Sequence, residues 1–132
     1  MAVVRISLDT NAYANLGKGS ESLLSLLETA ECIWISAVAL GELYAGFRIG
    51  SRYEQNVKEL VRFLDEPDVN IVEIDHNVAD RYGALVKILR ENGTPIPTND
   101  IWIAAVALET GSRLVTYDKH FDVVPGLIVV SP

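Results

Sequence analysis

Short apolar runs alternate with segments of helical periodicity along the whole chain, and this alternation limits the fold more than any other feature of the sequence. Apolar runs of this length, rich in β-branched residues, are typical of buried strands. Strands separated by helices predict an α/β fold: a mainly parallel sheet of about five strands in three layers, with helices on both faces. The expected strands are residues 3–8, 32–35, 70–74, 113–117 and 127–130.

The expected helices have recognisable start and stop signals. Ser20, Ser36 and Asp75 are typical N-cap residues, and each precedes a segment with apolar residues at helical spacing. The first helix should run from Thr10 to Leu16, and another should cover about 51–65. Thr98-Asn99 is expected to cap a helix over 100–110, which Gly111 ends in the left-handed conformation.

Composition restricts the class of protein. The 132 residues, of which 49% are hydrophobic, predict a single domain over residues 1–132 with its own core. The single cysteine, Cys32, excludes an internal disulfide, and no apolar stretch approaches the roughly 20 residues that span a bilayer, so we expect a cytoplasmic protein. The net charge of -7 argues against binding nucleic acid by overall attraction, unless several acids share a divalent cation.

Several acidic residues lie where chemistry is often placed in α/β proteins. Asp9 and Asp118 each follow an expected strand, and ligands of parallel sheets collect beyond the carboxyl ends of the strands. If the two strands are neighbours, both acids face the same crevice. Asp100 begins an apolar helix, where a carboxylate meets the positive end of the helix dipole. Each residue also has a simpler explanation as a turn or helix-capping residue, and periodicity alone makes Glu42 a solvent-exposed residue.

Four short motifs occur in order along the chain. They are Asp9-Thr10-Asn11, Glu42-Leu43, Pro97-Thr98-Asn99-Asp100 with Ile103-Ala104-Ala105, and Thr116-Tyr117-Asp118-Lys119-His120-Phe121 before Pro125-Gly126-Leu127. Together they resemble the PIN domain family, and more narrowly the VapC-type toxins of bacterial toxin–antitoxin pairs. The resemblance extends from the first expected strand to the last.

The resemblance implies that the first and fourth strands are adjacent and that four acids converge on Mg²⁺ or Mn²⁺. These acids are Asp9, Glu42, Asp100 and Asp118. It also implies that Asn11 and Thr116 orient carboxylates or water, with Asp122 a nearby spare acid. The implied activity is a metal-dependent endoribonuclease, the toxin of a type II pair, which hydrolyses RNA phosphodiesters through a metal-activated water. Hard oxygen ligands without cysteine favour Mg²⁺ or Mn²⁺, and such an ion lowers the pKa of bound water.

The resemblance further implies a homodimer and a cognate antitoxin protein. The antitoxin is expected in a groove beside residues 37–65, with Tyr44, Phe47 and Tyr53 as apolar anchors and a basic side chain of its own reaching the acids. The basic residues expected to meet RNA are Arg48, Arg52, Lys18 and Lys119, with Lys87 and Arg90 as weaker candidates. His76 and His120 are expected to have no catalytic role, because one begins a helix and the other lies in a loop.

Two alternative functions stay open on the sequence. A receiver domain is also an acidic α/β protein that binds Mg²⁺ at strand ends, but it needs an Asp after its middle strand and a Lys after its last. Here the third expected strand is followed by Asp75-His76 at a helix start, and Ser131-Pro132 rather than a lysine follow the last expected strand. The second alternative is a PIN-like scaffold that only binds RNA or protein, against which the presence of all four acids argues.

Overall fold

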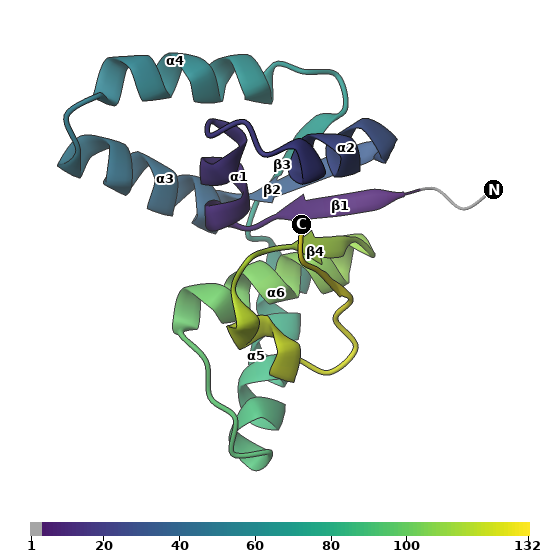
Figure 1. Ribbon diagram of the computed structural model, residues 1–132. Coiled ribbons are helices and arrows are strands. Elements are labelled where there is room, and N and C mark those ends of the chain that lie inside the picture. Colours follow the sequence, from purple (N-terminus) through teal and green to yellow (C-terminus); the bar gives the residue numbers. More distant parts are fainter. Residues whose placement is uncertain (1–3) are drawn as a thin grey trace.

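Strands and helices alternate in the computed structural model, which describes residues 4–132 (Figure 1). Val3, expected in the first strand, lies outside the described residues. The strands are β1 Arg5–Leu8, β2 Cys32–Ser36, β3 Val69–Val72, β4 Arg113–Val115 and β5 Val129–Val130. The helices are α1 Thr10–Leu16, α2 Glu21–Thr29, α3 Ala37–Ile49, α4 Tyr53–Leu64, α5 His76–Glu91 and α6 Thr98–Thr110, with a 3-10 helix, η1, at Lys119–Val123.

The five strands form one parallel sheet in the order β3-β2-β1-β4-β5. Leu8, the last residue of β1, is level with Ile35 of β2 and Val115 of β4. The predicted α/β fold is therefore confirmed, including the adjacency of the first and fourth strands. A receiver domain has the flavodoxin-like order 2-1-3-4-5, so this alternative is wrong.

Helices cover both faces of the sheet. In Figure 1, α1, α2 and α4 lie on one side of it, and α5 and α6 lie on the other. Each face carries its own cluster of buried side chains: Leu23 and Ala12 pack near Ile6 and Leu8, whereas the second cluster includes most of α6. The α3 and α4 helices form an antiparallel pair that projects beyond the sheet on the left of Figure 1.

Several element boundaries differ from the prediction. The α6 helix begins at Thr98 with Pro97 as its N-cap, so the expected capping pair Thr98-Asn99 lies inside the first turn and makes no side-chain cap. Proline is tolerated at this position because the backbone N–H of an N-cap residue has no partner within the helix, so its absence costs no helical hydrogen bond. The fourth strand ends at Val115, and the η1 helix was not predicted.

The remaining differences between the predicted and the observed elements are smaller. The third strand runs from Val69 to Val72, ending before the Asp75 cap of α5. The α4 helix begins at Tyr53. Helical spacing groups Leu24 and Val61 with the apolar residues of their helices, but both side chains are more than two-fifths exposed. No helix among residues 4–132 is both long enough and apolar enough to cross a bilayer.

Candidate active site

The site lies at the carboxyl ends of the two central strands. Asp9 follows β1 and Thr116 follows β4, and the Asp9 backbone N–H donates to the Val115 carbonyl at 3.2 Å. The predicted equivalence of Asp9 and Asp118 is wrong, because β4 ends two residues earlier than expected. Thr116 is the residue level with Asp9, and Asp118 reaches the site from the turn beyond it.

Asp9 is a buried carboxylate, 4% exposed, with both oxygens hydrogen-bonded. The Thr10 backbone N–H donates to Oδ1 at 2.7 Å, and the Thr116 hydroxyl donates to Oδ2 at 2.8 Å. Burial raises the pKa of Asp9 above its ordinary value, the two hydrogen bonds oppose that rise, and the charges of Asp100 and Glu42 add to it. The charged form of Asp9 is therefore costly unless a cation is near.

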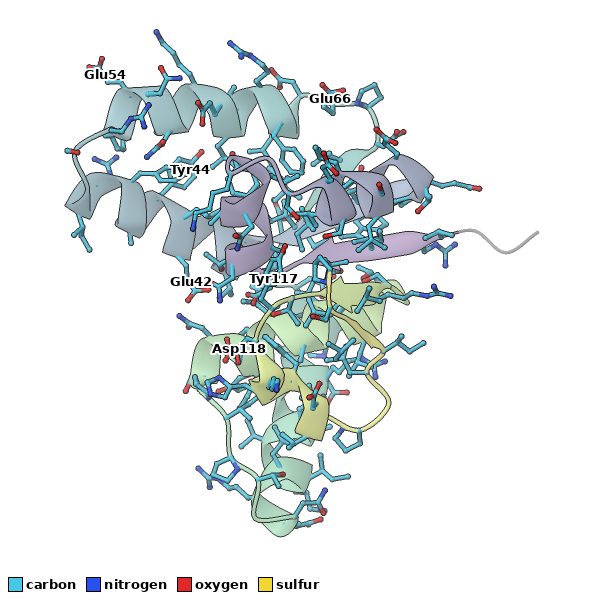
Figure 2. All side chains as sticks on the ribbon, in the orientation of Figure 1. Glu42, Tyr44, Glu54, Glu66, Tyr117 and Asp118 are labelled. Atoms are coloured by element: carbon cyan, nitrogen blue, oxygen red, sulfur yellow. The ribbon has the colours of Figure 1, made fainter. Side chains whose placement is uncertain are left out.

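Thr10 connects Glu42 to Asp9 by hydrogen bonds. The Thr10 hydroxyl donates to Glu42 Oε1 at 2.7 Å, so Thr10 holds Asp9 with its backbone and Glu42 with its side chain. Periodicity predicted an exposed residue, but Glu42 is half-buried because the α3 helix packs against α1 on this side. Figure 2 shows Glu42 pointing down from α3, with Asp118 below it on the same side of the molecule.

Asp100 and Asp118 bring two more carboxylates to the site. Asp100 lies in the first turn of α6, and Asp118 is the N-cap of η1, where its Oδ1 accepts from the His120 backbone N–H at 2.9 Å. Burial raises the pKa of Asp100; the hydrogen bond with His120 lowers it, and the charges of Asp118 and Glu42 raise it. Thr116 also accepts the Asp118 backbone N–H at 3.0 Å, which connects Asp118 to Asp9.

These residues surround an open cleft of about 430 Å³. Asp9 lies beneath it, joined to the lining residues by Thr10 and Thr116. Asn11 is exposed, and its backbone carbonyl accepts from the Asn15 side chain, whereas Asp122 is exposed on η1. The cleft is lined by Glu42, Pro97, Thr98, Asn99, Asp100, Asp118 and His120.

The expected RNA-binding residues are spread over the surface. Lys119 is exposed beside Asp118 in the chain, whereas Lys18 and Arg52 line a second, larger cavity. The Arg48 guanidinium lies 4.7 Å from the centre of the Tyr53 ring and so faces α4. The structure brings the four acids together but does not place these four basic residues in one patch around them.

Two residues at the site had no predicted role there. Thr10 was expected only as the first residue of a helix and as part of the Asp9-Thr10-Asn11 motif. The first residue of a helix has both its N–H and its hydroxyl free for such contacts. His120 was expected in a loop without a function, but it lines the cleft and contacts two acids. In the sequence, the sign of this role was that His120 lies two residues after Asp118. His76 is exposed at the start of α5.

Comparison with known proteins places this arrangement in a family. The PIN domain model matches residues 6–127. Ribonuclease VapC2 of Rickettsia felis is 34% identical over 128 residues, covering 92% of this chain and 93% of that protein. Ribonuclease VapC1 of Haemophilus influenzae is 28% identical over 120 residues, covering 87% and 88%. The crystal structure of VapBC2 from Rickettsia felis bound to a promoter DNA fragment superposes with a TM-score of 0.88, at 30% identity over 98% of this chain and 99% of that chain.

The fold and the acidic cleft thus define a nuclease of the PIN class. The chain belongs to the PIN domain family and, within it, to the VapC ribonuclease toxins of type II toxin–antitoxin systems. This membership confirms the resemblance inferred from the four motifs.

Proposed function

We propose that this chain cleaves RNA at the cleft described above, with Asp9, Glu42, Asp100 and Asp118 holding a Mg²⁺ or Mn²⁺ ion. The observation that carries the proposal is the convergence of four carboxylates from four separate segments. Among residues 4–132, no lysine or arginine forms an ion pair with any of them. Charges of neighbouring acids raise the pKa of both Asp9 and Asp100. Carboxylates that repel one another in this way take up protons or share a cation, and their oxygens suit a hard divalent ion.

The chain's own residues fix the geometry for this chemistry. Thr10 and Thr116 hold the Asp9 carboxylate in one orientation, and each of its oxygens keeps a lone pair for a cation. Thr10 fixes Glu42 through Oε1, which leaves Oε2 to the cleft. When bound, the ion supplies a Lewis acid for the phosphate and lowers the pKa of a water molecule. No protein nucleophile is needed, and a hydrolytic reaction follows.

The test is cleavage of a mixed RNA substrate by the full chain with Mg²⁺ or Mn²⁺ and with excess chelator. Asp9→Asn and Asp100→Asn should each lower the rate more than about a hundredfold, the usual cost of losing one electrostatic contact to the transition state. Asp122→Asn is the matched control, because Asp122 is exposed on η1 outside the cleft. Cleavage that survives chelation, or that both cleft variants retain, would contradict the proposed metal site. RNA binding without any cleavage would instead support a scaffold that only binds RNA.

We further propose an antitoxin as the protein partner, bound in the cavity between α1, α3 and α4. This groove has a volume of about 700 Å³ and a mostly apolar lining that also includes charged residues. The support from relatives is that several similar structures are VapBC complexes. Its lining includes Tyr13, Leu43, Phe47, Phe63, Arg52 and Glu59.

Of the three expected anchors, Phe47 lines the groove, while Tyr44 packs edge-on against Phe47 and Tyr53 lies under Arg48. Phe47→Ala should weaken capture of the co-encoded antitoxin by about tenfold or more, as expected for an aromatic hot spot. Ile49→Ala, at a side chain 88% exposed on the same helix, is the control. Equal antitoxin affinity for both variants, or a complex that cleaves RNA at the free toxin's rate, would refute this assignment.

Two expectations extend the same function. We propose that Lys119, Lys18, Arg48 and Arg52 contact RNA, and that the chain works as a homodimer in the cytoplasm. RNA titrations of Arg48→Ala and Arg52→Ala test the first expectation, with Arg62→Ala, exposed in the last turn of α4, as the comparison. Unchanged RNA affinity in the first two variants would dismiss those two residues. Light scattering of the purified chain tests the second, for which one chain's mass would be the contrary result.

A further inference from the structure

The His120 imidazole lies against two of the four acids. Its Nδ1 is 3.1 Å from Asp118 Oδ2 and 3.3 Å from Asp100 Oδ2. One ligand atom from each of these three residues lies within 4.8 Å of the others, and no other such trio of His, Cys, Asp or Glu occurs among residues 4–132. A nitrogen atom therefore faces the same cleft as the carboxylate oxygens.

The backbone fixes His120 in this position. The His120 N–H donates to Asp118 Oδ1, so the two oxygens of Asp118 face the backbone and the ring of the same residue. Phe121 follows directly and is fully buried, which anchors η1 in the core. In the metal-free chain Nδ1–H donates to the two carboxylates, since a carboxylate only accepts. The His120 side chain is 55% exposed, so when a cation binds the ring proton can instead reside on Nε2, which leaves the Nδ1 lone pair for the cation.

We propose that His120 Nδ1 is a ligand of the divalent ion, together with Asp100 and Asp118, and that it biases the site toward Mn²⁺ over Mg²⁺. The proposal rests on the proposed function only in requiring that the cleft bind a divalent cation. Mg²⁺ strongly prefers oxygen ligands, whereas imidazole nitrogen favours first-row transition ions. One nitrogen among several carboxylates therefore discriminates between two ions that the carboxylates alone hold similarly.

The test uses the metal-loaded full chain and two readouts that do not depend on RNA cleavage. Pulsed EPR of bound Mn²⁺ should show modulation from a directly coordinated ¹⁴N nucleus. Calorimetric titration with Mn²⁺ and Mg²⁺ should show tighter Mn²⁺ binding. His120→Asn places an amide oxygen at nearly the reach of Nδ1, so it should abolish the ¹⁴N signal and weaken Mn²⁺ binding by about tenfold or more, with little change for Mg²⁺.

His76→Asn is the matched control, since His76 is exposed at the start of α5 and should leave both readouts unchanged. Mn²⁺ that binds wild type without ¹⁴N modulation, or with the modulation retained in His120→Asn, would overturn the assignment of His120 while leaving the metal-dependent nuclease intact. A wild-type chain that binds neither ion would overturn both. The wild-type spectrum decides the question even if a variant fails to fold.

Discussion

Thr116→Val removes the one hydroxyl that joins two acids of the site. Thr116 is 1% exposed; its Oγ1 donates to Asp9 Oδ2 at 2.8 Å and accepts from the Asp118 N–H at 3.0 Å. Valine has the same shape, so the change deletes hydrogen bonds without opening a cavity. A hydrogen bond to a charged group contributes about 1.5–3 kcal/mol, and an unpaired buried amide costs about 1–3 kcal/mol. We expect a loss of about 3 kcal/mol in the free energy of unfolding at neutral pH.

The assay is thermal and urea unfolding of the metal-free chain across pH. For a chain of this size, about 3 kcal/mol lowers Tm by roughly 9–15 °C. The loss should shrink on acidification, because the Thr116 hydroxyl stabilises the charged form of Asp9 and loses this advantage once Asp9 is protonated. Thr110→Val is the control: Thr110 Oγ1 donates to the Val106 carbonyl at the other end of α6. A small, pH-independent loss in Thr116→Val, no larger than that of the control, would refute the reasoning.

Three further predictions follow from the same contacts. Burial raises the pKa of Asp9 above its unfolded value of 3.8, so the folded chain loses stability as the pH rises through the folded pKa. Without metal, Asp9→Asn should therefore have a higher Tm than wild type at pH 7.5. This difference in Tm should vanish toward about pH 4. Equal melting temperatures at pH 7.5 would contradict this. Mn²⁺ at about 100 times its Kd should stabilise wild type by about 2.7 kcal/mol, or roughly 8–13 °C, and Asp100→Asn should lose most of this shift. Calorimetry that shows the full shift in Asp100→Asn would remove that acid from the site. Gly111 has φ +63, so Gly111→Ala should lower the free energy of unfolding by about 1 kcal/mol. Gly83 lies within α5, so Gly83→Ala should raise it by about 0.5–1 kcal/mol. Thermal unfolding in which both substitutions change stability in the same direction would refute this contrast.

The sequence predicted the sheet and most helices because apolar spacing and caps determine them locally. Ser20 and Asp75 cap their helices through side-chain oxygens as expected, and the strand runs pair in one parallel sheet. The boundaries that were wrong depend on contacts from elsewhere. The fourth strand stops at Val115, and the hydroxyl of the next residue, Thr116, donates to Asp9, more than a hundred residues earlier in the chain.

The site was harder to predict than the fold for the same reason. Glu42 is exposed by periodicity and enters the site only because α1 packs against α3 and Thr10 donates to it. The motif resemblance, rather than the helix pattern, predicted its place. His120 was expected in a loop, since no local pattern revealed the short η1 helix that turns its ring toward Asp100. Contacts between distant segments therefore decide which acids and which histidine face the cleft.

The most direct test of the shared metal site is anomalous diffraction from crystals of the chain grown with Mn²⁺, recorded at the manganese absorption edge. We predict one or more peaks in the cleft within bonding distance of carboxylate oxygens of Asp9, Glu42, Asp100 or Asp118. A saturated crystal with no peak there, or with manganese bound only at other surface acids, would contradict the account.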